Sequence, residues 1–159
     1  MNDRLARLAD LVRLVGQGGP AVCNVAVTNV CNATCDFCNF AYDKGFVTHR
    51  LYLDAARFGD CLDILHRRGV RYLSFQGGEP LLHPRIVDMV GAAVARGIVP
   101  TLITNGWLLP RKLDALIRAG LRTLLISIDS PDVEAHETNR GLKGVCARIR
   151  AANAKARAA

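Results

Sequence analysis

The sequence predicts an α/β protein built around a parallel sheet, arranged as an open or partial barrel. Short apolar segments rich in β-branched residues alternate four times with amphipathic helical segments, and glycines end three of the helices. This alternation is typical of right-handed βαβ units whose helices cover a parallel sheet. The chain has 159 residues, whereas a closed barrel of eight such units needs about 250. We therefore expect four βα units and no closed barrel.

The first half of the chain contains an N-terminal helix and the first two strand–helix units. In residues 1–20, leucines and valines recur at helical spacing, and a glycine-rich stretch before Pro20 ends the helix. The first strand is expected at 22–28 and its helix at 53–68, with Phe58, Cys61, Leu62 and Leu65 on one apolar face. The second strand is expected at 71–75. Its helix, 84–96, begins with Pro84 at the first helical position.

The second half repeats the pattern. Strands are expected at 99–103 and 122–128, and helices at 110–119 and 144–156. The exception to this regularity is the connection 29–52, which is far longer than the usual strand–helix loop of a few residues. Loops of this length usually serve a function, and this one contains three cysteines.

The three cysteines Cys31, Cys35 and Cys38 lie within eight positions. Tetrahedral zinc sites and the common iron–sulfur clusters use four protein ligands, so a fourth is missing. Cys23 lies at the far end of its strand, Cys61 is expected in a helix core, and Cys146 has no polar neighbours in sequence. We therefore expect the fourth position to be open; the alternative is a partial zinc site completed by His49.

Polar groups follow each predicted strand at the same edge of the sheet. After the cysteines come Gln76–Pro80 (QGGEP), Thr104–Gly106 (TNG) and Ser127–Ser130 (SIDS). The carboxyl ends of parallel strands are where α/β proteins bind ligands. Taken singly, each motif is also compatible with an ordinary turn or loop cap. Their convergence predicts a binding site at this edge.

This set of motifs resembles the radical S-adenosylmethionine (SAM) superfamily. The order C-N-A-T-C-D-F-C, G-G-E-P, T-N-G and S-I-D-S is most similar to the branch containing molybdenum-cofactor biosynthesis protein A, the peptide-modifying enzymes and the hopanoid-related proteins. The resemblance runs from about residue 22 to about residue 150. It implies that Cys31, Cys35 and Cys38 bind a [4Fe–4S] cluster whose fourth iron chelates SAM.

The resemblance also implies the SAM contacts. Phe37 would lie near the adenine, and Gly77, Gly78 and Glu79 would face the methionine ammonium. Ser127 and Asp129 would contact the methionine carboxylate or the ribose, and Thr104 and Asn105 would touch SAM or substrate. The implied activity is reductive cleavage of SAM to a 5′-deoxyadenosyl radical, which abstracts hydrogen from an unknown small-molecule or peptide substrate. The implied electron donor is a small reductase of the flavodoxin or ferredoxin type.

The predicted organisation is an N-terminal helix and linker (1–20), an incomplete radical SAM core (21–150) and a basic, alanine-rich tail (151–159). Family members usually have six βα units, so either the chain is a fragment or a partner supplies the missing wall. A non-catalytic iron–sulfur or metal-binding module is the alternative function.

Charge and hydropathy bear on whether the chain binds RNA, spans a membrane or is secreted. Residues 140–159 carry six basic and no acidic side chains, which accounts for most of the net charge of +7. We interpret these as a solvated helix face, with RNA binding as the lesser alternative. No segment approaches the ~20 apolar residues of a membrane span, and the N-terminus does not resemble a secretory signal. We expect a cytoplasmic protein, where clustered cysteines indicate metal binding or catalysis.

Overall fold

The computed structural model describes residues 3–18, 20–42 and 49–158. Its centre is a sheet of four parallel strands in the order β1-β2-β3-β4. The strands are β1 (Val22–Thr28), β2 (Tyr72–Gly77), β3 (Val99–Thr104) and β4 (Thr123–Ile126). All four predicted strands are present, and the predicted α/β class with a partial parallel barrel is confirmed.

The two faces of the sheet differ because alternate side chains point to opposite sides. Val27, Leu73, Phe75 and Leu102 form the core beneath the helices. On the other face, which we call the inner face, one row crosses all four strands in register: Asn24, Ser74, Thr101 and Thr123. None of these four side chains is buried and none is charged. The core therefore lies on one side of the sheet.

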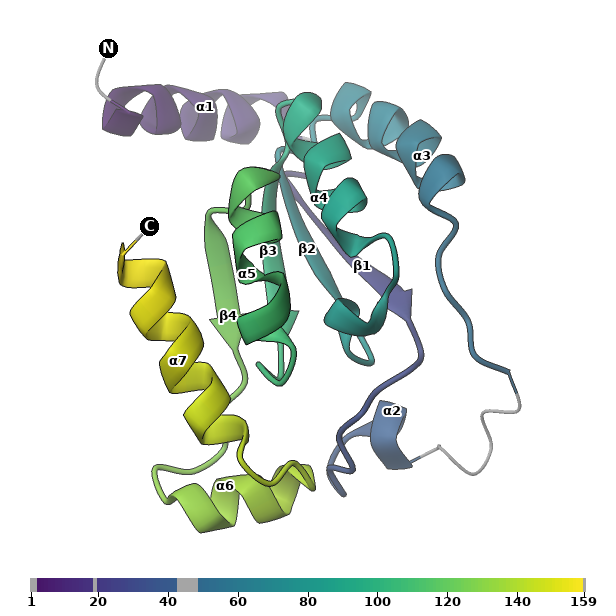
Figure 1. Ribbon diagram of the computed structural model, residues 1–159. Coiled ribbons are helices and arrows are strands. Elements are labelled where there is room, and N and C mark those ends of the chain that lie inside the picture. The colour runs from purple at the N-terminus through teal and green to yellow at the C-terminus, as the bar shows by residue number, and fades with distance from the viewer. Residues whose placement is uncertain (1–2, 19, 43–48, 159) are drawn as a thin grey trace.

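Three helices cover the core face: α3 (Ala55–Arg67), α4 (Ile86–Ala95) and α5 (Leu109–Arg118). Figure 1 shows them lying side by side over the strands, with the carboxyl ends of the strands at the bottom of the view. Each helix contributes side chains that are almost fully buried, listed here from α3 to α5: Phe58, Leu62, Ile86, Met89, Val90, Leu109, Leu113 and Leu116. For α3, the apolar spacing in the sequence correctly placed Phe58 and Leu62 on the buried face.

Two expectations about the helices were wrong. Cys61 is exposed, because it lies at the edge of the apolar stripe of α3 and faces solvent. Pro84 does not open α4, which starts at Ile86. The chain first forms a short 3₁₀ helix, η2 (Pro80–Leu82), followed by a turn in which the backbone N–H of Arg85 donates to His83 Nδ1 (3.1 Å).

Two helices were not predicted. One is the short α2 (Asn39–Tyr42) after the cysteines, and the other is α6 (Val133–Arg140) between β4 and α7 (Val145–Ala158). Asp132 caps α6 by accepting from the N–H of Ala135 (2.8 Å), and Gly141 ends it with a φ of 61°. Figure 1 places α2 and α6 at the end of the molecule where the strands terminate.

The N-terminal helix α1 (Asp3–Gln17) lies at the opposite end (Figure 1). This helix was predicted from the spacing of its leucines and valines. Most of its described apolar side chains are nevertheless exposed, and Leu14 is the buried one. In the part of the chain that the structure describes, no helix combines the length and apolar character needed to cross a bilayer.

Candidate functional site at the carboxyl ends of the strands

The described part of the 29–52 connection is anchored where it leaves β1. We call residues 29–38 the cysteine loop. The Thr28 hydroxyl oxygen accepts from the N–H of Val30 (3.0 Å), and the Asn29 side chain bonds to the backbone of His49 and Leu51. Farther along, the N–H of Thr34 donates to the carbonyl of Arg140 (2.9 Å). The loop is therefore held between the end of β1 and the end of α6.

A cavity of about 270 Å³ lies between this loop and the strand ends. It receives side chains or backbone from the ends of all four strands. Nine of the eleven predicted site residues line it: Cys31, Cys35, Cys38, Gly77, Gly78, Glu79, Thr104, Asn105 and Ser127. Phe37 and Asp129 do not. The cavity is also lined by residues that were not predicted as ligands, among them Phe40, Gln76 and Arg140.

The two glycines let the loop after β2 pack against the backbone that leaves β1. Gly77 has a φ of 122°, and a Cβ on Gly78 would lie 2.2 Å from the carbonyl oxygen of Val30. The same contact contains two hydrogen bonds, from Gly78 N–H to Thr28 O and from Glu79 N–H to Val30 O, each 2.8 Å. Only glycine allows this close approach.

Glu79 is buried, and its carboxylate is bonded within the protein. Oε1 accepts from the N–H of Leu81 (3.0 Å) and the hydroxyl of Thr104 (2.7 Å), and Oε2 accepts from the N–H of Asn105 (2.8 Å). Burial raises the pKa of Glu79, and these hydrogen bonds act against that rise. The carboxylate thus joins the loops after β2 and β3.

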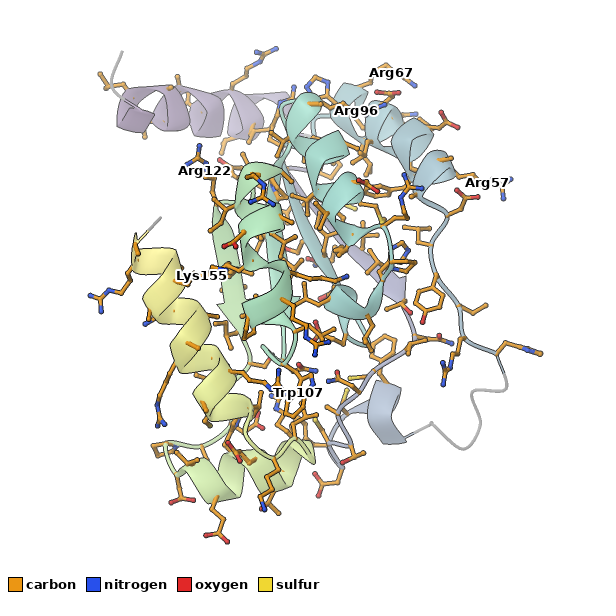
Figure 2. All side chains as sticks on the ribbon, viewed as in Figure 1. Arg57, Arg67, Arg96, Trp107, Arg122 and Lys155 are labelled. Carbon is orange, nitrogen blue, oxygen red and sulfur yellow. The ribbon has the colours of Figure 1, made fainter. Side chains whose placement is uncertain are left out.

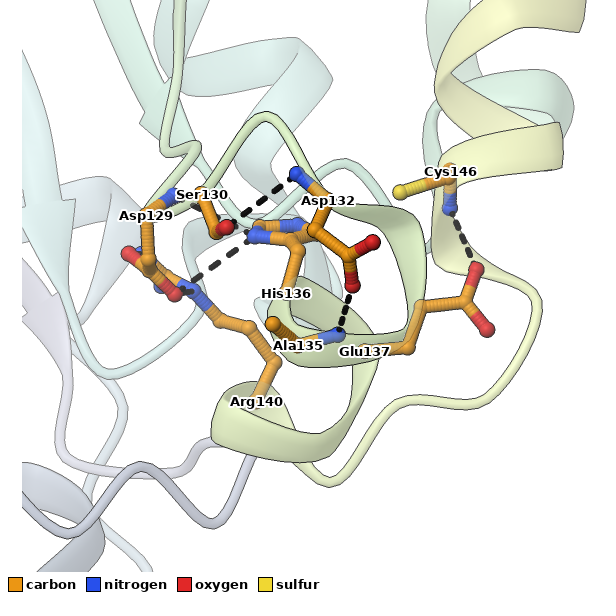
Figure 3. Close-up of polar contacts among 8 residues, drawn as sticks. All are labelled: Asp129, Ser130, Asp132, Ala135, His136, Glu137, Arg140 and Cys146. Carbon is orange, nitrogen blue, oxygen red and sulfur yellow. Dashed lines mark hydrogen bonds and ion pairs between the residues drawn. The ribbon is translucent and has the colours of Figure 1, made fainter.

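Arg140 organises the two predicted residues that lie off the cavity. Its guanidinium forms a two-point ion pair with Asp129, one bond of which is Nε to Oδ2 at 2.7 Å, and its Cζ lies 5.6 Å from the centre of the Phe37 ring. Figure 3 shows the side chains of Arg140 and His136 both directed at Asp129. His136 Nδ1 accepts from the N–H of Asp129 (3.2 Å). Sequence reasoning missed Arg140 because α6, which carries it, was not predicted.

Comparison with known sequences identifies the family of this chain. The sequence profile of the Radical SAM superfamily matches residues 25–158. The chain belongs to the radical SAM superfamily. It is 38% identical over 136 residues to GTP 3′,8-cyclase of Chlorobaculum tepidum, covering 84% of this chain and 37% of that protein. It is 34% identical over 123 residues to PqqA peptide cyclase of Gluconobacter oxydans, covering 77% of this chain and 34% of that protein.

Solved structures share the same fold. Streptococcus suis SuiB bound to S-adenosylmethionine superposes with a TM-score of 0.66 and 21% identity, covering 86% of this chain and 32% of SuiB. The radical SAM chain described here thus spans about a third to two fifths of the length of these proteins. Radical SAM proteins use a [4Fe–4S] cluster and SAM, which confirms the cofactors implied by the motifs at the level of the family.

The donor set in the cavity fits a cluster better than a single ion. Three thiols line one wall, and His49 is not among the lining residues. Within the described residues, no three or more His, Cys, Asp or Glu side chains converge on one metal-ion position. A [4Fe–4S] cluster places its cysteine sulfurs on different iron atoms, so its ligands are spread more widely than those of one zinc ion. His49 is therefore not placed beside the three thiols, where the partial zinc site would need it.

The other three cysteines lie outside the cavity lining. Cys61 is exposed on α3, and Cys23 is half-buried in β1. Cys146, at the start of α7, packs against the small apolar cluster that also contains Cys31, Cys35 and Cys38. The backbone N–H of Cys146 donates to Glu137 Oε1 (3.1 Å).

Proposed function

We propose that this chain binds a [4Fe–4S] cluster through Cys31, Cys35 and Cys38, and SAM in the adjoining cavity, as the catalytic core of a radical SAM enzyme. The observation that carries the proposal is the presence of all three thiols in one cavity that the ends of all four strands also line. When bound, the cluster supplies one electron that cleaves SAM into methionine and a 5′-deoxyadenosyl radical, which abstracts hydrogen from the substrate.

The residues around the cavity would divide the binding of SAM between them. Backbone carbonyls near Gly77 and Gly78 suit the methionine ammonium, which has three donors. Arg140 and Ser127 line the cavity and suit the methionine carboxylate, because the guanidinium has five N–H donors and gives only two of them to Asp129. Thr104 and Asn105 both bond to Glu79 and would hold the loops that frame SAM.

Three of the roles implied by the resemblance are revised in this proposal. The Glu79 carboxylate accepts three protein hydrogen bonds, so we assign it to shaping the site and assign the ammonium to the backbone carbonyls. Asp129 would orient Arg140 instead of touching SAM. The Phe37 ring is 61% exposed and stacks with Arg140, whereas Phe40 lines the cavity and is the aromatic side chain better placed for adenine.

The substrate we propose is a peptide, with a small molecule as the alternative. PqqA peptide cyclase is a relative, and a SuiB structure with a bound precursor peptide shares the fold at a TM-score of 0.62. GTP 3′,8-cyclase supports the small-molecule alternative. A flavodoxin- or ferredoxin-type reductase would supply the electron, since the reaction consumes one electron per SAM cleaved.

Binding of RNA by the basic C-terminal segment is not supported by its contacts. Arg140 pairs with Asp129, Lys155 Nζ lies 2.5 Å from Asp114 Oδ2, and Arg148 Cζ lies 4.1 Å from the centre of the Trp107 ring. Figure 2 shows Trp107 near the N-terminal end of α7 and Lys155 farther along the helix. Half of the six basic side chains therefore have partners within the protein.

Anaerobic reconstitution tests the proposal. The reduced protein is incubated with iron and sulfide, its absorption spectrum and iron content are measured, and dithionite and SAM are then added. We expect a brown protein with about four irons per chain and formation of 5′-deoxyadenosine, detected by chromatography. A cluster without 5′-deoxyadenosine would support the non-catalytic module, and stoichiometric zinc with no uptake of iron would exclude both.

A further inference from the structure

A continuous path of hydrogen bonds joins the buried Glu79 carboxylate to the cysteine loop. Glu79 Oε2 accepts from the N–H of Asn105 (2.8 Å), and Asn105 Nδ2 donates to Asn32 Oδ1 (2.9 Å). Asn32 directly follows Cys31. The path therefore crosses from the loop after β2, through the loop after β3, to the segment that carries the first cysteine.

The direction of the bond between the two asparagines is determined by a third residue. Asn105 Oδ1 accepts from the backbone N–H of Trp107 (3.0 Å). Because a backbone N–H can only donate, the amide oxygen of Asn105 must face Trp107, and its amino group must face Asn32. Asn32 accordingly presents its oxygen. Asn105 is 5% exposed, so little water competes for this bond.

The bond reaches a part of the loop that is itself well packed. Ala33 and Cys35 are 1% and 3% exposed. The N–H of Ala33 donates to Cys31 Sγ (3.4 Å), and the N–H of Thr34 donates to the Arg140 carbonyl (2.9 Å). Asn105 thus holds this segment from the side of β3, and the end of α6 holds it from the other.

We propose that Asn105 is a positioning residue that, through Asn32, holds the cysteine loop in the conformation in which its three thiols face the cavity. The role of the thiols as cluster ligands rests on the proposed function. The contact between the two asparagines does not, because it joins two side chains of the protein directly and involves no cofactor.

Substitutions that keep or remove the acceptor at position 32 test this assignment. Amide exchange of Ala33 and Thr34 is measured by NMR in the reduced, cluster-free full chain. Asn32→Ala removes the acceptor and should speed this exchange roughly fivefold to tenfold, the effect of one net hydrogen bond. Asn32→Asp keeps the acceptor and should change the exchange rate by less than about twofold. Asn153→Asp, on the exposed side of α7, controls for the added charge.

A double substitution tests the pairing itself. In Asn105→Asp, the Asn32 amide can rotate and donate to the new carboxylate. Amide exchange of Ala33 and Thr34 should therefore accelerate only modestly. In the Asn32→Asp/Asn105→Asp protein, measured at a pH where both carboxylates are ionised, neither side chain can donate and the two charges repel, so exchange should accelerate by more than the product of the single effects. Exchange in β2 shows that each variant is folded.

Two results would overturn the proposal. One is equal acceleration by Asn32→Ala and Asn32→Asp, and the other is a double variant whose effect equals the product of the two single effects. The comparison of Asn32→Ala with Asn32→Asp tests the proposal even where the double variant does not fold. Because these measurements need neither cluster nor SAM, a failed 5′-deoxyadenosine assay would count against the proposed function and leave this result unchanged.

Discussion

At the scale of single residues, the site separates groups that face the cavity from groups that hold those groups in place. The three cysteines of the cysteine loop line the cavity, and Glu79 lines it as well, but the Glu79 carboxylate is held by three hydrogen-bond donors of the protein. Arg140 belongs to both kinds, because it lines the cavity and is held by Asp129.

Replacing any one of Cys31, Cys35 or Cys38 by alanine should abolish cluster assembly, because two thiolates do not hold the cluster. Cys61→Ala is the matched control: its thiol is exposed on α3, and the variant should retain the brown chromophore. Absorption near 400 nm and iron content after reconstitution (about four irons per chain in the control) provide the measurement. Loss of colour in Cys61→Ala would show that the ligand assignment is wrong.

Glu79→Gln should destabilise the protein by about 1–3 kcal/mol, because the amide nitrogen would face a buried backbone N–H and leave it without an acceptor. Urea unfolding measures the change in free energy. Glu134→Gln, an exposed acid in α6, should stay within about 0.5 kcal/mol of wild type. Equal stability of the two variants would contradict the hydrogen bonding assigned to Glu79.

At the scale of elements, close contacts between strand ends determine which residues are required. The loop after β2 and the backbone leaving β1 approach so closely that Gly78 has no room for a side chain. The glycine–glycine pair was predicted from sequence as a SAM-binding feature. The structure shows that Gly78 is also needed for this packing.

Gly78→Ala should destabilise the protein by about 3 kcal/mol, since a methyl group 2.2 Å from the Val30 oxygen forces the two loops apart. Gly91→Ala is the control within a helix: nothing lies within 4 Å of the added methyl group. That change should stabilise the protein by about 0.5–1 kcal/mol through the better helix propensity of alanine. Thermal unfolding followed by circular dichroism compares the two.

Glu137 in α6 caps α7, because its carboxylate accepts from the N–H groups of Gly144 (2.6 Å) and Cys146 (3.1 Å). These hydrogen bonds, that of Gly144 first, lower the pKa of Glu137. The carboxylate therefore stabilises the fold above about pH 4.3, the ordinary glutamate pKa, and this contribution is lost as the pH falls through the lowered value. Glu137→Gln should lose less stability than wild type on acidification in that window, as followed by urea unfolding. Glu134→Gln, in the same helix, should follow the wild-type profile.

At the scale of the whole molecule, the sheet has one packed face and one face with no buried side chain along the row Asn24, Ser74, Thr101 and Thr123. A parallel sheet usually has both faces covered. Here the part of the inner face nearest the carboxyl ends of the strands, at Ala26, Gln76 and Ile103, forms part of the cavity wall. The inner face thus continues from the site along the sheet.

The difference between the two faces of the sheet predicts that substitution by lysine has little effect on stability on one face and a large effect on the other. Asn24→Lys, on the inner face of β1, should alter the free energy of unfolding by no more than about 0.5 kcal/mol. Leu73→Lys, on the fully buried core face of β2, should unfold the protein or cost more than about 4 kcal/mol, because it buries an unpaired charge. Urea unfolding of both variants measures the difference.

Most of this architecture could be predicted from the sequence. Alternating apolar segments indicated the four strands, and the parallel order placed their carboxyl ends together, so the nine site residues that line the cavity could be grouped by position along the chain. Arg140 could not, because it reaches the cavity from α6, a helix with a weak apolar pattern and a single buried side chain, His136. Phe37 and Asp129 were grouped with them by position, but neither lines the cavity, and both side chains contact Arg140 instead.

The two-faced sheet also limits how the length of this chain can vary. A side chain's face is determined by odd or even position, so deleting Tyr72 from the start of β2 would turn Leu73 and Phe75 outward and Ser74 and Gln76 into the core. The same deletion would withdraw Gln76 from the cavity. Insertions and deletions among homologues of this chain should therefore be found in the connection between β1 and α3, and not within the strands.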